Sequence, residues 1–334
     1  MAELSAQLRS LAPRLHAGGR DVGGLRRLSG GASQETWSFD LLLEGGGTVP
    51  LILRRAPEGS AQRAEGNATL VQQAALLEAA AAAGVPVPAV PWVLQPAQQM
   101  GEGFIMQRIA GETLGRRIVT EPQLAGARDQ LARQCGRALA RIHGMAKDAL
   151  PPLRRAPPAE ELAHYEAQYR SHGLKQPVFE LGLHWLKTHA PAQPAALALV
   201  HGDFRNGNLV VGEDGLRAVL DWELAHVGDP MEDLGWLCVT SWRYGRLDLP
   251  VGGFGTREEL FAGYAEAGGR VDAERVHYWE VLGTLKWGVI CQSMAQAYLS
   301  GAERNAERAA IGRRASEAEI DLLELLAPLP RKAA

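Results

Sequence analysis

One stretch near the middle of the chain carries most of the residues whose types and spacing suit catalysis. Residues 200–234 read VHGDFRNGNLVVGEDGLRAVLDWELAHVGDPMEDL. Asp203 and Asn208 share one predicted loop, and Asp221 directly follows the strand-like run Leu216–Leu220. Such a set can hold Mg²⁺ with hard oxygen ligands and leave one carboxylate for a hydroxyl. The pattern favours phosphoryl transfer from a nucleotide; the alternative is an Asp that caps a turn, a turn Asn and a strand-end Asp.

The elements that would position this stretch begin with a small sheet. Leucines at positions 4, 8, 11 and 15 predict an amphipathic helix at the N-terminus. A further helix is expected over 68–83, because this segment is rich in Ala and Leu and ends at Gly84. Between and after these helices, Gly-rich turns separate strand-like runs. We expect strands at Leu25–Leu28, Thr36–Leu43, Val49–Arg54, Trp92–Leu94 and Phe104–Gln107.

Beyond Gly111 the pattern becomes mainly helical. Apolar positions 131, 135, 139 and 142 lie on one helix face that ends at His143-Gly144. Further helices are expected at 160–171, 178–189, 257–267, 273–298 and 317–326. The predicted fold class is therefore α+β, with residues 1–106 forming a small lobe with an antiparallel sheet and one main helix. Residues 107–334 form a larger, mainly helical lobe, and the active site lies between the two.

Composition excludes several classes of protein. The chain has 334 residues, 46% of them hydrophobic and 22% charged, which is ordinary for a globular protein. The net charge of -3 gives no basic field for nucleic acid. Three cysteines without CxxC spacing argue against a zinc site or a disulfide framework. No secretory signal or membrane-length apolar run is visible, so we expect a cytoplasmic protein without a membrane partner.

The motifs HGDFRNGN, LDWE and GDPxxDL resemble those of the aminoglycoside phosphotransferase and choline kinase superfamily, which has a protein-kinase-like fold. The closest likeness is to bacterial phosphotransferases related to the kinase domain fused to some acyl-CoA dehydrogenases. The resemblance covers nearly the whole chain. Its supporting segments are LSGGASQETW at 28–37, LILRR at 51–55, GVPVP at 84–88, GETL at 111–114, and the tail from Trp279 through 285–287 to RRASEAE at 313–319.

The resemblance implies roles for the central stretch. Asp203 would be the catalytic base, and Asn208 and Asp221 would be the metal ligands. Arg205 would reach the transferring phosphate or an anionic group of the substrate, since Arg suits planar phosphate recognition; the alternative is a surface arginine. Glu223 would ligate a second metal, hold a water or face the substrate. His201, Asp229 and Asp233 are expected to have structural roles.

The nucleotide would be held by the small lobe. Gly30, Gly31 and Ser33 lie in a turn whose backbone N–H groups could approach phosphates, and Ser33 could add a hydroxyl. On its own this segment favours an ordinary hairpin turn, and its position before the strand that ends in Leu-Arg-Arg strengthens the phosphate-binding interpretation. Arg54 stands where kinases place the lysine that contacts the α- and β-phosphates. Backbone N–H and C=O groups at Gln107 and Ile109 would form hydrogen bonds with the adenine ring.

One position departs from the family pattern. The glutamate that pairs with the strand cation falls, by counting back from Gly84, at Gln73. An amide cannot form that ion pair, although it can accept a hydrogen bond from Arg54. Glu65 and Glu78 are the other acidic candidates, and helical spacing does not favour Glu78.

These observations predict an Mg²⁺- and ATP-dependent kinase that phosphorylates a hydroxyl of a small molecule. The subgroup resemblance implies a hydroxyacyl compound or its CoA thioester as the acceptor. An aminoglycoside antibiotic kinase is an alternative, which would need an acidic acceptor pocket. A nucleotide-binding pseudokinase is a second alternative, supported only by Gln73. The tryptophans and tyrosines of the C-terminal half are expected mainly in the core, and the sequence gives no indication of an oligomeric state.

Overall fold

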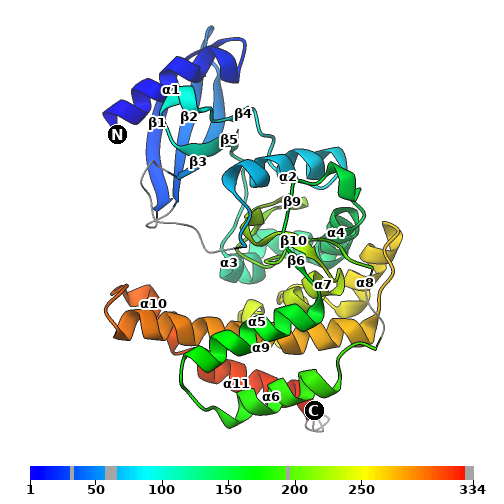
Figure 1. The fold of residues 1–334 in the computed structure, drawn as a ribbon. Helices are drawn as coiled ribbons and strands as arrows, with labels where there is room; N and C mark the ends of the chain where they lie inside the picture. The colour runs from blue at the N-terminus through cyan, green and yellow to red at the C-terminus, as the bar shows by residue number, and fades with distance from the viewer. Residues whose placement is uncertain (31–33, 57–65, 193–195, 328–334) are drawn as a thin grey trace.

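The computed structural model of the protein describes residues 1–30, 34–56, 66–192 and 196–327. The chain forms a small part built on an antiparallel sheet and a larger helical part, as Figure 1 shows. This arrangement confirms the α+β class predicted from the sequence. Gly31, Ser33 and Glu65 lie outside the described residues.

The small part contains a sheet with the strand order β1-β2-β3-β5-β4, in which every pairing is antiparallel. Its strands match the five expected ones, with β1 starting earlier than predicted. The strands are β1 (Gly19–Gly30), β2 (Glu35–Leu43), β3 (Thr48–Ala56), β4 (Trp92–Val93) and β5 (Glu102–Gln107).

Two helices cover opposite faces of this sheet, because successive side chains of a strand point to opposite sides. Leu51 and Leu53 of β3 join the core formed with helix α1 (Ala2–Leu15). Ile52, between them, joins the core that includes helix α2 (Leu70–Ala82). The same alternation turns Arg54 toward the α2 side, where the active site is expected.

Helix α2 also contacts the helical part, so the two parts share a core. Its N-terminus is closed by a capping box, in which the Thr69 side chain accepts from the Gln72 backbone N–H and Gln72 accepts from that of Thr69. The backbone N–H of Ala68 donates to the carbonyl of Glu223 at 2.8 Å. Figure 1 shows α2 lying between the sheet and the larger part.

The larger part is organised around the long helix α9 (Ala273–Leu299), which packs against α5, α6, α7, α10 and α11. Its other helices are α3 (Gly115–Thr120), α4 (Ala125–His143), α5 (Pro158–Ser171), α6 (Pro177–Thr188), α7 (Met231–Cys238), α8 (Arg257–Glu266), α10 (Ala306–Gly312) and α11 (Ala315–Leu326). Short 3₁₀ turns lie at Pro96–Gln98, Pro122–Leu124, Lys147–Ala149, Trp222–Leu224 and Thr240–Trp242. The sequence did not indicate α3, α7 or α10.

Two small sheets of the larger part carry the loops of the expected active site. The first has the order β6 (Arg155–Ala156), β10 (His226–Gly228) and β7 (Ala198–Val200). The second is the hairpin of β8 (Leu209–Gly212) and β9 (Gly215–Val219). Among the helices of the described segments, none has the length and apolar character that crossing a membrane requires. The three cysteines are all described, and each is buried as a free thiol.

Candidate active site

Hydrogen bonds to helix α7 fix the loop between β7 and β8. The buried Asp233 accepts hydrogen bonds from the backbone N–H groups of His201 and Gly202, at 2.8 and 2.9 Å. Burial acts to raise the pKa of Asp233, but hydrogen bonds from His143 and the His201 backbone lower it below its ordinary value. Gly202 has a φ of 81°, and a Cβ there would lie 2.5 Å from the carbonyl oxygen of Leu224. The loop conformation therefore requires glycine at this position.

His201 holds the loop rather than facing outward. Its ring is buried, and Nε2 lies 3.0 Å from the carbonyl oxygen of Leu220. Nδ1 accepts the backbone N–H of Asp203 at 3.2 Å. Because Nδ1 is an acceptor, the proton of a neutral ring sits on Nε2 and is donated to Leu220. Both nitrogens are engaged in backbone contacts, as expected for a structural histidine.

Three donors converge on the carboxylate of Asp203. Oδ1 accepts from Nε1 of Trp236 at 2.8 Å and from Nε of Arg205 at 2.9 Å. Oδ2 accepts from Nδ2 of Asn208 at 2.6 Å. A carboxylate has about four lone-pair sites, so these contacts leave room for one more hydrogen at a defined position. This side chain is 14% exposed, which suits a group that meets a hydroxyl at the surface of a cleft.

Arg205 lies beside this carboxylate and is not a solvated surface residue. Its side chain is 27% exposed, and Nη1 donates to the backbone carbonyl of Asn206 at 2.9 Å. The guanidinium also lies over the ring of Trp242, 4.6 Å from the ring centre. An arginine stacked on an aromatic face keeps its charge in a limited region of space. Arg205 is therefore held within reach of any group that reacts at Asp203.

The β8–β9 hairpin brings Asn208 and Asp221 together. Leu209 pairs with Val219, and the backbone N–H of Leu220 donates to the carbonyl of Asn208 at 2.8 Å. Asn208 thus lies opposite the residue that precedes Asp221. Both side-chain hydrogen bonds of Asn208 use Nδ2, one to each of the backbone and carboxylate oxygens of Asp203, so Oδ1 is the atom that can face a cation.

This donor set fits Mg²⁺, which takes few protein oxygens and completes its shell with phosphate and water. Asp221 supplies a carboxylate, and its backbone has a φ of 61°, an uncommon conformation for a residue other than glycine. No cluster of three or more His, Cys, Asp or Glu side chains suited to a metal occurs in the described segments. A metal held by Asn208 and Asp221 would complete its shell with oxygens of phosphate and water.

Arg54 reaches across from the sheet to Asp221. Its Nη2 lies 2.9 Å from Oδ1 of Asp221 and 3.3 Å from Oε1 of Gln34. The next residue, Arg55, points to the opposite face of β3 and pairs with Glu35 at 3.0 Å. Of the two adjacent arginines, Arg54 is the one directed at Asp221.

Gln73 does not contact Arg54, and the hypothesis of a hydrogen bond between them is wrong for this conformation. Its Nε2 donates to the carbonyl of Ala68 within the turn that precedes α2, at 3.0 Å, and its Oε1 is buried without a partner in the described residues. Arg54 instead uses Asp221, which offers a full negative charge. Glu78 is exposed on the far side of α2.

The remaining predicted nucleotide contacts lie at the edges of the sheet. Gly30 ends β1 and pairs with Glu35 of β2. Gln107 ends β5, and its backbone N–H already donates to the carbonyl of Ala89 at 2.8 Å. Its carbonyl and the backbone of Ile109 lie at the connection between the two parts.

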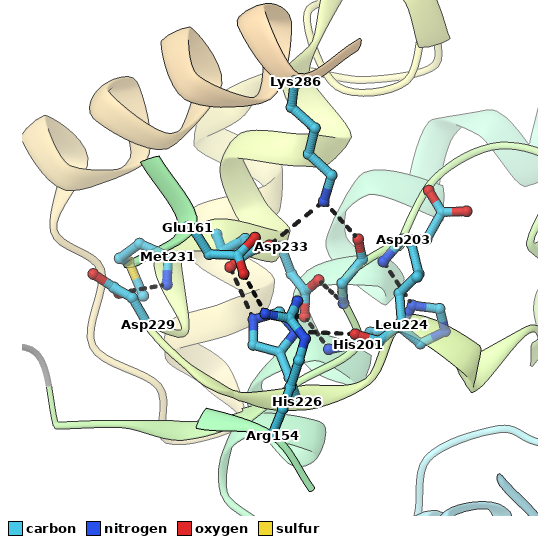
Figure 2. Close-up of polar contacts among 12 residues, drawn as sticks. Arg154, Glu161, His201, Asp203, Leu224, His226, Asp229, Met231, Asp233 and Lys286 are labelled. Carbon is cyan, nitrogen blue, oxygen red and sulfur yellow. Dashed lines mark hydrogen bonds and ion pairs between the residues drawn. The ribbon is translucent and has the colours of Figure 1, made fainter. Parts of the chain in front are cut away.

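Behind the loop, the structure contains a cluster of buried charged side chains that the sequence did not indicate (Figure 2). His226 lies 3.1 Å from Glu232, and Lys286 lies 3.8 Å from Glu232. Arg154 pairs with the buried Glu161. Asp229 is also structural: it accepts from Met231 N–H at 3.0 Å and from Arg275 at 2.9 Å.

Comparisons with known proteins give one family model and several longer relatives. A model of the phosphotransferase enzyme family matches residues 24–270. Acyl-CoA dehydrogenase family member 10 of Mus musculus is 25% identical over 279 residues, which cover 75% of this chain and 25% of that protein. Acyl-CoA dehydrogenase family member 11 of Gallus gallus is 26% identical over 342 residues, which cover 96% and 41%. The chain thus spans less than half the length of these relatives.

Solved structures share the fold at low identity. A protein from Ralstonia eutropha assigned as an aminoglycoside phosphotransferase has a TM-score of 0.72 at 20% identity, and the match covers 97% of both chains. A choline/ethanolamine kinase family protein from Mesorhizobium loti has a TM-score of 0.63 at 22% identity, covering 97% and 95%. The phosphotransferase APH(4)-Ia, solved with ADP and hygromycin B, has a TM-score of 0.61 at 16% identity, covering 96% and 98%. These likenesses confirm the kinase-like fold.

Proposed function

The chain belongs to the phosphotransferase enzyme family, and we propose that it moves the γ-phosphate of ATP to a hydroxyl of a small molecule. The observation that carries this proposal is the convergence of three donors on Asp203 beside the paired Asn208 and Asp221. A carboxylate held in this way has one direction left for a substrate hydroxyl. Positioning of this kind is the main protein contribution to phosphoryl transfer.

In the proposed reaction, Asp203 accepts the proton of the acceptor hydroxyl as its oxygen bonds to the γ-phosphorus. The bond from that phosphorus to the bridging oxygen breaks, and ADP leaves with the bonding electrons. Arg205, stacked beside the base, attracts the transferring phosphoryl group. Arg54, on the sheet of the small lobe, contacts the other phosphates. Residues 1–106 act as the nucleotide-binding lobe, with Gly30, Gly31 and Ser33 near the phosphates and Gln107 and Ile109 near adenine.

Asn208 and Asp221 would hold Mg²⁺, the first through its amide Oδ1 and the second through its carboxylate. When bound, the ion neutralises negative charge on the phosphates. Before the nucleotide arrives, the protein keeps the same place neutral by pairing Asp221 with Arg54.

For the acceptor, we propose a hydroxyacyl compound or its CoA thioester. The support comes from the relatives in sequence, which are named as acyl-CoA dehydrogenase family members and carry the matching segment within a longer protein. An aminoglycoside acceptor draws its support only from structures that share the fold at low identity. A pseudokinase would need a defect at the site, and Asp203, Asn208 and Asp221 are all in place.

The test is a panel of acceptors with Mg-ATP, and with Mg-GTP as a second donor. Hydroxyacyl-CoAs, the matching free hydroxy acids, amino alcohols and aminoglycosides are incubated with the protein, and ADP release and product mass are measured. We expect a mass gain of one phosphate on a hydroxyacyl substrate, absent with an Asp203→Ala variant. If only aminoglycosides are phosphorylated, the hydroxyacyl proposal is wrong and the acceptor is an aminoglycoside. If the protein binds nucleotide but forms no product with any acceptor, the result favours a pseudokinase.

A further inference from the structure

Two buried residues lie beside the candidate base and its loop. We propose that Trp236 is a positioning residue for Asp203 and that Lys286 holds the indole of Trp236 in position. The proposal deepens the proposed function and rests on it for the activity measurements only. The contacts that carry it are the Trp236–Asp203 hydrogen bond, the position of Lys286 over the indole, and Gly283, which leaves room for the ring.

Trp236 lies on the same face of α7 as Asp233, three residues earlier, because residues at i and i+3 are neighbours on a helix. Asp233 fixes the loop backbone through His201 and Gly202. Trp236 fixes the side chain of the next loop residue, through its Nε1 and Oδ1 of Asp203 at 2.8 Å. One helix face therefore sets both the path of the loop and the orientation of its carboxylate.

The side chain of Lys286, on α9, contacts both the indole of Trp236 and the loop that carries Asp203. Its Nζ lies 4.7 Å from the ring centre of Trp236 and donates to the carbonyl of Gly202 at 3.3 Å. Figure 2 shows the Lys286 side chain extending toward the loop that carries His201 and Asp203. Burial acts to lower the pKa of Lys286, but its acidic neighbours, among them Tyr165 and Glu232, raise it above the usual value. The amine is therefore a cation, which is attracted to the face of the indole.

A glycine on each helix allows α7 and α9 to pack closely, and the glycine on α9 makes room for the indole. A Cβ on Gly283 of α9 would lie 3.0 Å from Cε3 of Trp236. A Cβ on Gly235 of α7 would lie 2.7 Å from Cβ of Trp279, so larger residues would push the two helices apart. Because the ring is 4% exposed and closely surrounded, its N–H has one accessible direction, toward Asp203.

This fixed donor has a different task from that of Arg205. Both donate to Oδ1 of Asp203, but Arg205 is partly exposed, and in the proposed reaction its guanidinium also attracts the phosphoryl group. Trp236 would then be the contact that keeps Oδ1 in place while Oδ2 remains bonded to Asn208. Its loss should lower the rate of the chemical step and leave the binding of nucleotide unchanged.

The central variant is Trp236→Phe, which keeps an aromatic ring and removes the N–H. Its matched control is Trp279→Phe, since Nε1 of Trp279 is buried in a neighbouring position without a partner in the described residues. We expect kcat to fall about 10- to 100-fold in Trp236→Phe, the loss of one hydrogen bond to a charged group, with the KM for ATP unchanged. Trp279→Phe should match wild type. Gly283→Ala, which keeps the N–H but displaces the ring, should also lower kcat.

A measurement without any acceptor tests the contacts directly. The eight tryptophans give separate indole N–H signals in a ¹⁵N-edited spectrum, and the signal of Trp236 is the one missing from Trp236→Phe. We expect this signal to move in Asp203→Ala and in Lys286→Met, and to return toward its wild-type position in Lys286→Arg. The kcat of the two Lys286 variants should follow the same order. Thermal unfolding shows which variants are folded.

Two results would overturn the proposal. One is a wild-type kcat in folded Trp236→Phe with an acceptor that the wild type phosphorylates. The other is a Trp236 signal that does not respond to Asp203→Ala. If the wild type phosphorylates no acceptor, the proposed function fails, while the indole signal still decides whether Trp236 holds Asp203.

Discussion

Replacing Asp203 by asparagine changes more than the charge of the candidate base. All three contacts of its carboxylate are with N–H donors, two at Oδ1 and one at Oδ2. An amide has only one acceptor oxygen. If its NH₂ group takes the place of Oδ1, it faces Trp236 and Arg205; if it takes the place of Oδ2, it faces Asn208. Either orientation sets at least one donor against another.

Two effects of different size follow from this geometry. Loss of the base should lower kcat by about 10²- to 10⁴-fold, the usual contribution of general-base catalysis. The unsatisfied donor should lower the free energy of unfolding by about 1–3 kcal/mol, the cost of a buried polar group without a partner. Asp203→Ala should lose as much activity as Asp203→Asn, but it places no new N–H donor against those of Trp236 or Asn208.

The assay combines turnover with an acceptor that the wild type phosphorylates, calorimetric titration of Mg-ATP, and urea unfolding. Asp214→Asn is the matched control, because Asp214 pairs with Arg217 in the nearby hairpin and its side chain is 70% exposed. That variant should retain activity and stability. Near-wild-type kcat in Asp203→Asn would refute the assignment of the base, and unchanged stability would refute the convergence of donors.

Other consequences of the site can be measured in the same way. Asp221→Ala should abolish Mg²⁺-dependent ATP binding, because it removes a charged ligand. Asn208→Ala should weaken this binding less, because it removes a neutral ligand. If calorimetric titration of Mg-ATP gives wild-type binding for both variants, the metal site lies elsewhere. Gln73→Glu should lower the free energy of unfolding by at least about 1–3 kcal/mol, because it buries a carboxylate facing the carbonyl of Ala68; an unchanged urea midpoint would contradict this. Burial acts to lower the pKa of His226, but Glu232 raises this pKa above its usual 6.5. Protonated His226 therefore stabilises the fold fully below pH 6.5, and this stabilisation is lost as the pH rises through the folded-state pKa. His226→Asn should remove that loss from stability curves measured between pH 6 and 9, and an identical pH dependence in the variant would exclude His226 as its source.

The sequence was sufficient for elements whose apolar residues have a clear period. The strands of the small sheet alternate between two cores, and the predicted bounds of α9 and the predicted C-terminal end of α4 lie within a few residues of those observed. Helix α7 was missed because all of its residues from Met231 to Cys238 are buried, which removes the polar face that marks an amphipathic helix.

The candidate site was predictable where it is local in sequence and not where it depends on packing. Asn208 and Asp221 belong to one hairpin, and the spacing of their motif reflects its register. The contact of Trp236 with Asp203 joins residues 33 positions apart, and that of Arg54 with Asp221 joins residues 167 apart. Trp236 was expected in the core, and it is buried there; only the direction of its N–H shows its second task.

The ion pair between Arg54 and Asp221 couples two binding events that are usually treated separately. On the proposed roles, free Mg²⁺ would have to take Asp221 away from Arg54, and free ATP would have to take Arg54 away from Asp221. Each ligand alone breaks the pair and leaves one charge uncompensated, whereas the Mg-ATP complex brings a partner for both. The ion pair therefore makes metal and nucleotide binding mutually dependent, so that each should tighten the binding of the other by the same factor.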